Sequence, residues 1–286
     1  MTENSLINLI KRALPAPILH VVRRIRTPKH RPDAEIAELR KRHLSYQLAD
    51  PNEITLRPGL TLRIDPESRY PFEHFCFRSP EMTCELDRFI KNAAAFSSFV
   101  DVGANHGIFS LTFCALRSDG RVVAIDPSPI AFEILEKNLK LNSFSQAQAR
   151  KIACGAKSGE VRMKPNWHHL QAIRDEDNDV DAVAVPMLSL DQICEEENIV
   201  PELLKIDVEG FELPVLQGGE HVLQTAKLLF LEIHPPDLDE LHLSHLAIFD
   251  LLTSSGWSCY TLKEAPLTRE DFAAQTNIFW TMWRKC

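Results

Sequence analysis

Apolar residues recur along this chain in two spacings, one typical of strands and the other of helices. Short runs rich in valine, isoleucine and leucine predict buried β-strands, and longer segments with apolar positions three or four apart predict helices. Strands are expected at residues 98–102, 121–125, 149–153, 203–206 and 228–233. Helices are expected from residue 108 and at residues 129–141, 190–197, 214–224 and 244–254. Strands that alternate with helices predict a parallel sheet covered on both faces, so we expect a doubly wound α/β fold.

Other segments flank or interrupt this alternation. Residues 54–64 predict two short strands around a Pro-Gly turn, and residues 80–95 predict a helix. Antiparallel pairs are expected as an insertion at residues 161–163 and 182–186, and as a terminal hairpin at residues 258–262 and 278–283. The sheet should therefore be mostly parallel, with an antiparallel hairpin at its C-terminal end.

The first 53 residues differ in character from the rest. Residues 5–14 fit a short amphipathic helix, and residues 1–43 carry ten Lys or Arg against four Asp or Glu, a net charge of +6. We predict that residues 1–53 form a basic helical arm, a small appendage to one domain of residues 54–286. Such an arm allows peripheral contact with an acidic membrane surface, or packing on the body or on another subunit of a homo-oligomer.

Charge and cysteine usage narrow the classes of function. The whole chain has a net charge of −8, so the part beyond the basic segment must carry −14, which disfavours nucleic acid as a partner. Seven widely spaced cysteines without a C-x-x-C indicate reduced thiols rather than a disulfide framework or a zinc site. No apolar run reaches the roughly 20 residues of a membrane helix, and Lys11 and Arg12 interrupt the stretch that a secretory signal would need. We expect a cytoplasmic protein, with any contact to the inner face of the membrane made through the arm.

A glycine-rich turn follows the first strand of the predicted sheet. The segment from Phe99 reads FVDVGANHGIF, which places Gly103 and Gly107 between a buried strand and a helix. Glycine lets the backbone turn tightly and approach a ligand closely, and a helix N-terminus offers free N–H groups. A dinucleotide-binding loop would have a glycine where Asn105 stands. The turn by itself fits either a cofactor loop or a structural strand–turn–helix.

An acidic residue, Asp126, ends the next strand and precedes Pro127. A carboxylate at this place can accept hydrogen bonds from the two hydroxyls of a ribose. NAD enzymes and methyltransferases share this feature, so it supports a nucleoside ligand without choosing between them. The alternative is a residue that only caps the helix beginning at Pro129.

Two more carboxylates follow the fourth parallel strand. The segment from Leu203 reads LLKIDVEGFE, so Asp207 and Glu209 come just past the carboxyl end of that strand. Open α/β sheets bind ligands at this edge. These carboxylates are therefore expected beside the glycine-rich turn and Asp126.

The ordered motifs resemble the FkbM family of S-adenosylmethionine-dependent methyltransferases over roughly residues 80–283. The family pattern reads V-D-V-G-A-N-x-G, an acidic strand end with proline, S-L-D, K-I-D-V-E-G-x-E, V-L-x-G and E-x-H. This chain has these segments at residues 101–107, 126–127, 189–191, 205–212, 215–218 and 232–234. The resemblance implies a Rossmann-like fold, S-adenosyl-L-methionine as cofactor, and O-methylation of a hydroxyl of a sugar, glycan or related natural product.

The resemblance also implies which residues bind the cofactor. The turn would hold the methionine end, the next acidic strand end the ribose, and the fourth strand end would face the cofactor near its methyl group. The implied cofactor-binding residues are Asp101, Gly103, Asn105, Gly107, Asp126 and Asp207.

The acceptor side would be lined by Glu209, Glu232 and His234. An alcohol must lose its proton as it is methylated, so a base is useful. His234 is one candidate, because imidazole titrates near neutral pH, and Glu209 is another. A third option is a divalent cation held by Asp207, Glu209 and Glu232, whose hard oxygen ligands suit Mg²⁺. The predicted catalytic residues are therefore His234, Glu209 and Asp207, and no metal site is assigned.

Two other classes of function share parts of this pattern. An NAD-linked oxidoreductase would share the first two motifs, although Asn105 replaces the glycine that approaches a pyrophosphate. A non-catalytic scaffold in a glycan-assembly complex would keep the fold without the reaction. The intact carboxylates Asp101, Asp126, Asp207 and Glu209 favour the enzyme.

Overall fold

The structure is a computed structural model that describes residue 50 and residues 52–166, 169–173 and 181–286. The chain divides into two units, residues 1–47 and 48–286, and only the second is described. The predicted helix at residues 5–14 lies outside the described residues, as does nearly all of the predicted arm of residues 1–53. The membrane and subunit contacts of that arm stay predictions. Within the described ranges, no helix is long and apolar enough to cross a membrane.

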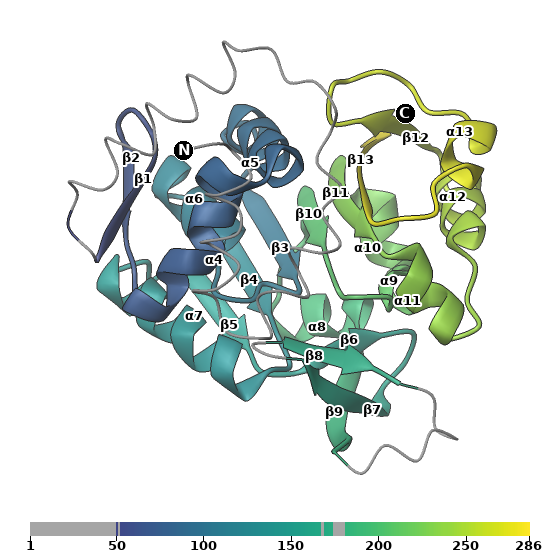
Figure 1. The fold of residues 1–286 in the computed structure, drawn as a ribbon, viewed down its shortest axis with the longest axis horizontal. Helices are drawn as coiled ribbons and strands as arrows, with labels where there is room; N and C mark the ends of the chain where they lie inside the picture. The colour runs from purple at the N-terminus through teal and green to yellow at the C-terminus, as the bar shows by residue number, and fades with distance from the viewer. Residues whose placement is uncertain (1–49, 51, 167–168, 174–180) are drawn as a thin grey trace, which may run out of the picture. The chain divides into compact units, whose positions relative to one another are not determined.

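Seven strands of the described chain form the central sheet, in the order β12-β13-β11-β10-β3-β4-β5 (Figure 1). The five strands from β11 to β5 are parallel, and β13 runs antiparallel to its neighbours β11 and β12. The structure therefore confirms the predicted mostly parallel sheet with a C-terminal antiparallel hairpin. The strands are β3 (Ser98–Val102), β4 (Arg121–Ile125), β5 (Ala147–Arg150), β10 (Leu203–Ile206), β11 (Leu228–Ile233), β12 (Trp257–Thr261) and β13 (Phe279–Lys285).

Helices cover both faces of this sheet, as predicted (Figure 1). Successive side chains of a strand point to opposite faces. Phe99 therefore packs on Phe89 of α5, with ring centroids 5.0 Å apart, whereas Val100 belongs to the core on the other face. Strands β3, β10 and β11 are buried on both faces, which is why they read as continuous apolar runs. One face carries α5 (Pro80–Ala93), α6 (Ile108–Leu116) and α7 (Pro129–Leu141), and the other α8 (Leu190–Glu196), α9 (Glu212–Gln217), α10 (Glu220–Thr225) and α12 (His245–Ser254).

The direction of winding reverses beside β3. The chain passes from β3 to β4 and β5 on one side, and then returns to add β10 and β11 on the other side. Ligands of open α/β sheets bind at such a reversal, in the crevice at the carboxyl ends of the strands. The turn after β3 and the carboxylates after β10 lie at this place, as the sequence predicts.

A second sheet of the described chain has four strands in the order β6-β9-β7-β8. The predicted inserted pair is confirmed as β7 and β9, which are antiparallel with Val161 opposite Val185. The single strand predicted at residues 149–153 is wrong in extent, because β5 ends at Arg150 and β6 begins at Ala153 in the second sheet. Tertiary pairing decides this division, since β6 joins β9 in parallel. The strands are β6 (Ala153–Gly155), β7 (Gly159–Asn166), β8 (His169–Ala172) and β9 (Val183–Ser189).

The single helix predicted at residues 214–224 consists of two helices, α9 and α10, which are separated at Gly218 and Gly219. A Cβ atom at Gly218 would lie 2.0 Å from the carbonyl oxygen of Gly155, so the backbones touch where the chain breaks. The Asp191 carboxylate then caps the second helix and accepts hydrogen bonds from the backbone N–H groups of His221 and Val222 at 3.0 and 2.9 Å. The backbone N–H of Asp191 also donates to the carbonyl oxygen of Gly218 at 2.9 Å, and this bond joins the S-L-D segment to the V-L-x-G segment.

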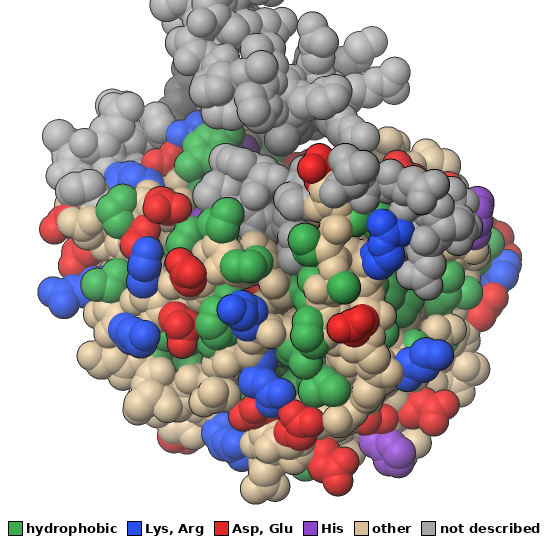
Figure 2. All heavy atoms as spheres, turned by 90° about the horizontal axis from the view of Figure 1, so that it is seen from below, with side chains coloured by type: hydrophobic (Ala, Val, Ile, Leu, Met, Phe, Trp, Pro, Cys, Tyr) green, Lys and Arg blue, Asp and Glu red, His purple; other side chains and the backbone are tan. Residues whose placement is uncertain are grey.

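Shorter elements complete the described part. The predicted strands around the Pro-Gly turn are confirmed as β1 (Glu53–Arg57) and β2 (Leu60–Arg63). The face at the bottom of Figure 1 carries Lys and Arg side chains interspersed with Asp and Glu (Figure 2). All seven cysteines lie in the described ranges and none of them forms a disulfide there, which agrees with the predicted reduced thiols. The sequence analysis did not anticipate η1 (Pro66–Ser68), α4 (Arg69–Glu73), the π-helix η2 (His74–Arg78), α11 (Pro235–Glu240) or α13 (Arg269–Ala273).

Candidate active site

A cavity opens at the carboxyl ends of β3, β4 and β10, where the winding reverses. Its polar wall contains five of the residues predicted from sequence, and the small sheet supplies an apolar wall that includes Cys154, Val161 and Met163. Asp101, Gly107 and His234 do not line it. The predicted residues on the polar wall are Gly103, Asn105, Asp126, Asp207 and Glu209.

Gly103 brings the turn after β3 against the end of β10. Its φ angle is +82°, and a Cβ atom would lie 1.7 Å from the carbonyl oxygen of Asp207. Any side chain would therefore collide with backbone, so the position requires glycine on both conformational and steric grounds. Asn105 also has a left-handed backbone, with φ of +49°, and its side-chain oxygen accepts a hydrogen bond from the backbone of His106.

Asp101 supports the turn from behind. It is buried, and its Oδ2 accepts hydrogen bonds from the backbone N–H and the hydroxyl of Ser110, at 3.1 and 2.6 Å. Burial raises the pKa of Asp101 to about 6, against the opposing effects of Ser110 and Lys205. Asp101 thus anchors the start of α6, which is how it orients the turn that precedes this helix.

Asp126 reaches the cavity and organises the loop around it. Its two carboxylate oxygens accept hydrogen bonds from the backbone N–H groups of Asn105 and Ser128, at 2.8 and 2.9 Å. Each oxygen keeps a further lone pair for a ligand hydroxyl. Burial raises the pKa of Asp126 to about 7, although these backbone donors favour the charged form. The helix-cap alternative does not apply, because the N-cap of α7 is Ser128.

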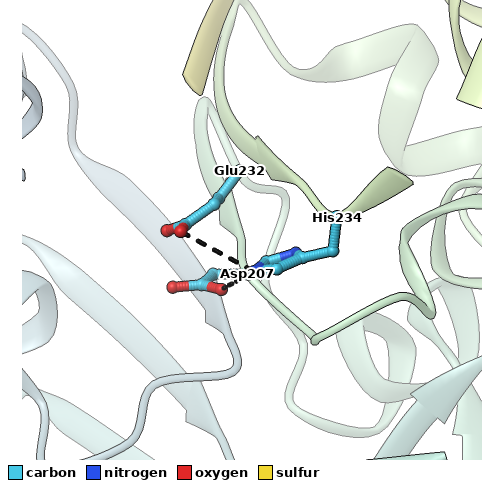
Figure 3. A group of neighbouring side chains, drawn as sticks. All are labelled: Asp207, Glu232 and His234. Atoms are coloured by element: carbon cyan, nitrogen blue, oxygen red, sulfur yellow. Dashed lines mark ion pairs between the residues drawn. The ribbon is translucent and has the colours of Figure 1, made fainter. Parts of the chain in front are cut away.

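His234 lies behind the cavity and is surrounded by carboxylates. Its Nδ1 is 2.7 Å from Glu212 Oε1, and the imidazole is only 1% exposed. Its Nε2 faces Glu232 Oε1 at 3.6 Å, Glu209 Oε2 at 3.6 Å and Asp207 Oδ1 at 3.9 Å. Figure 3 shows Asp207, Glu232 and His234 converging from β10, β11 and the segment after β11.

These surroundings determine the charge of the imidazole. Burial lowers the pKa of His234, but Glu209, Glu212 and Glu232 outweigh it and hold the pKa well above its ordinary value. A raised pKa favours the protonated ring, in which both nitrogens carry a hydrogen and neither can accept a proton. The general base, for which His234 and Glu209 are the candidates from sequence, stays a prediction.

Two buried charged residues, Lys205 and Glu85, lie beside Asp207 and were not predicted from the sequence as site residues. Lys205 on β10 is 1% exposed, and its Nζ lies 3.3 Å from Asp207 Oδ2 and 3.4 Å from Oε1 of Glu85 on α5. Burial raises the pKa of Asp207, but Lys205 and His234 reverse the effect and bring it below its ordinary value. Asp207 is thus a carboxylate on the cavity wall. The sequence feature that could have identified Lys205 is its position as a charged residue within the otherwise apolar strand Leu203–Ile206.

The pKa values of Glu85 and Glu232 are raised, in contrast to that of Asp207. Burial raises the pKa of Glu85 to about 7 despite the adjacent Lys205. Burial and the charge of Asp207 raise the pKa of Glu232 well above its ordinary value. Glu85 stands in no motif, so only the packing of α5 on the sheet identifies it.

Comparisons with known proteins point to one family. Residues 101–259 match the family described as the Methyltransferase FkbM domain. Hexuronic acid methyltransferase AglP of Haloferax volcanii is 27% identical over 151 residues, which cover 49% of this chain and 59% of that protein. The 2-O-methyltransferase NoeI of Sinorhizobium fredii is 24% identical over 173 residues, which cover 54% of this chain and 70% of that protein. A solved FkbM methyltransferase from Methylobacillus flagellatus is 16% identical with a TM-score of 0.42, covering 88% of this chain and 59% of that one.

Proposed function

Because this chain belongs to the FkbM methyltransferase family, we propose that it transfers the methyl group of S-adenosyl-L-methionine to a hydroxyl of a sugar or a sugar-containing natural product. The observation that carries the proposal is the cavity at the winding reversal, with Asp126 and Asp207 on its wall. The names of two relatives, a hexuronic acid methyltransferase and a 2-O-methyltransferase, support a sugar hydroxyl as acceptor.

The cavity wall suits the successive parts of the cofactor. Asp126 would accept hydrogen bonds from the ribose hydroxyls with the lone pairs that its backbone donors leave. The turn at Gly103 and Asn105 would hold the methionine end, supported by Asp101 through α6. The apolar side chains of the small sheet would cover the adenine. Asp207 would then lie nearest the methyl group.

Methyl transfer from a sulfonium is an in-line displacement, so positioning supplies much of its acceleration. The acceptor oxygen would form a bond to the methyl carbon while the carbon–sulfur bond breaks. The electron pair of the carbon–sulfur bond would go to sulfur and leave S-adenosylhomocysteine. The hydroxyl proton must leave as well. Asp207, which is ionised, or Glu209 would receive it, directly or with a divalent cation that polarises the hydroxyl.

The test combines cofactor binding with transfer of a labelled methyl group. Asp126→Ala should weaken S-adenosylmethionine binding in calorimetry at least about tenfold, because the ribose loses a hydrogen-bond partner that a buried site cannot replace with water. Asp239→Ala, at an exposed position on α11, is the matched control and should bind as the wild type does. Wild-type affinity in Asp126→Ala would refute the cofactor site.

The acceptor is tested with a panel of uronic-acid and neutral oligosaccharides. The wild-type chain should label a hydroxyl on at least one of them, and Asp207→Ala should lower the rate by about 100-fold or more. Cofactor binding without transfer to any sugar or related natural product would favour the non-catalytic scaffold.

A further inference from the structure

Three side chains at the end of the central sheet offer ligand atoms to a common point. Asp207, Glu232 and His234 each present one atom, and these atoms lie within 4.8 Å of one another (Figure 3). Asp207 follows β10, Glu232 belongs to β11 and His234 comes directly after it. Only Glu232 lies within a strand, but the other two residues directly follow the ends of neighbouring parallel strands, so the pairing of β10 with β11 largely sets their spacing.

The distances are those of ligands that share an ion. His234 Nε2 stands 3.6 Å from Glu232 Oε1 and 3.9 Å from Asp207 Oδ1, both beyond hydrogen-bond length. Two ligand atoms at about 2.1 Å from one metal ion lie about 3.0 Å apart at the right angle of an octahedron, about 3.4 Å apart at a tetrahedral angle, and farther apart at wider angles. The gaps between the nitrogen and the two oxygens therefore match a cation between them better than direct contacts.

The imidazole is oriented as a metal ligand would be. Its Nδ1 is 2.7 Å from Glu212 Oε1, and the same oxygen also accepts a hydrogen bond from the backbone of Gly210 at 2.9 Å. Metal-ligating histidines usually donate their other ring N–H to a carboxylate, which fixes the tautomer and the ring plane. Glu212 is fully buried and takes no part in the three-residue cluster, so it is an independent indication. It directs the buried Nε2 of His234 towards the two carboxylates.

The two carboxylate oxygens of Asp207 face different partners, and one of them faces the proposed metal position. Its Oδ2 pairs with Lys205 at 3.3 Å, whereas its Oδ1 faces His234. Glu232 is 5% exposed and meets the same nitrogen. Buried carboxylates are stable when they are paired or when they coordinate a metal.

We propose that Asp207, Glu232 and His234 bind one divalent cation, with Glu212 fixing the imidazole. Two carboxylates suit Mg²⁺ and Mn²⁺, and an imidazole favours the transition metal, so Mn²⁺ is the expected ion. This ligand set differs from the all-carboxylate set that was only one option from sequence, because His234 takes the place of Glu209. Glu209 is a third exposed, lines the cavity and lies 3.6 Å from His234 Nε2, so a carboxylate of the cavity wall lies next to the proposed ion.

The role of the ion, but not its binding, rests on the proposed function. Three protein ligands leave coordination positions open on the side of Asp207, which lines the cavity. An acceptor hydroxyl at such a position would be polarised and would lose its proton more readily. The proton would pass to the exposed carboxylate of Glu209.

Binding is measured on the full chain after EDTA dialysis, by titration with Mn²⁺ under electron paramagnetic resonance. The wild-type chain should bind one Mn²⁺, with ¹⁴N coupling from a directly bound imidazole in the electron spin echo. Glu232→Gln and His234→Gln should each weaken Mn²⁺ binding at least tenfold. Glu240→Gln, at an exposed position on α11, should not. Absence of a bound ion, or of the nitrogen coupling, in the wild-type chain overturns the inference without reliance on any variant.

Two controls separate this inference from the proposed function. Calorimetry with S-adenosylhomocysteine should give wild-type affinity for Glu232→Gln, which shows that the variant is folded. Methyl transfer should stop after EDTA treatment and return with Mn²⁺. Transfer that persists in EDTA overturns the role of the ion while the methyltransferase assignment stands. If Mn²⁺ binds to the three ligands but no acceptor is methylated, the metal site stands and the proposed methyltransferase function is overturned.

Discussion

The chemistry of His234 depends on its neighbours more than on the imidazole itself. Four carboxyl groups surround the ring, and Glu209, Glu212 and Glu232 among them raise its pKa well above the ordinary value in spite of burial. A histidine in this state is a poor base, but a neutral one with Glu212 behind it is a good metal ligand. At the scale of single residues, burial and charge also separate Asp207, which is ionised, from Asp126, which titrates near neutral pH.

The pKa of Asp126 predicts a pH dependence for cofactor binding. Burial raises this pKa to about 7, so the carboxylate that the ribose hydroxyls require is lost as the pH falls through that value. Binding favours the ionised form, and affinity should therefore rise with pH, by roughly tenfold from pH 6 to pH 8. Calorimetry across this range measures it. Asp126→Asn removes the titrating group, so an equally steep dependence in that variant would contradict the assignment.

At the scale of elements, the close approach of β3 and β10 shapes the cavity. The two strands are parallel neighbours, and Gly103 continues beyond β3 to touch the backbone of Asp207 beyond β10. Elsewhere Asp191 caps α10 and so ties the end of β9 to the helix pair α9 and α10. Sequence motifs that are far apart along the chain are thus parts of single contacts.

Two glycines with the same backbone conformation test the importance of this approach. Gly59 and Gly103 both have φ of +82°, but a Cβ atom at Gly59 would meet nothing within 4 Å. Gly59→Ala should cost about 1–2 kcal/mol of unfolding free energy from backbone strain alone. Gly103→Ala should cost about 1–3 kcal/mol more and weaken cofactor binding, because β3 and β10 must move apart. Urea denaturation compares them, and equal losses would show that the strand ends are not in tight contact.

At the scale of the whole molecule, the site is assembled from both sheets. The central sheet supplies the carboxylates at its reversal point, and the small sheet supplies the apolar wall of the same cavity. The match to the FkbM family over residues 101–259 spans both parts. We therefore expect cofactor binding to stabilise the two sheets as one unit.

Thermal unfolding with added cofactors tests this expectation. At about 100 times its Kd, S-adenosylmethionine should stabilise the folded chain by about 2.7 kcal/mol and raise the melting temperature by a few degrees. NAD at the same concentration should have no effect, because the turn has Asn105 in place of a glycine that would approach a pyrophosphate. A higher melting temperature with NAD and an unchanged one with S-adenosylmethionine would favour an NAD-linked oxidoreductase instead.

Local patterns in the sequence determined the order of the elements and five residues on the polar wall of the cavity. Apolar runs predicted β3, β10 and β11 because a strand buried on both faces needs apolar residues throughout. The motifs located Asp126 and Asp207 because a ligand site at strand ends follows from the parallel order alone. Element boundaries were less accurate where tertiary pairing decides, as in the division of β5 from β6.

Only the tertiary structure decided which charges meet. Glu85 lies 120 residues before Lys205, and their contact depends on how α5 packs on the sheet. The order of strands brings Glu232 beside Asp207, and the turn after β10 brings Glu212 behind His234. Protonation and metal affinity depend on these distances and on burial, which no local pattern encodes. The sequence by itself thus identified the family and predicted the cofactor-binding residues, whereas the fold determined which charged groups surround His234.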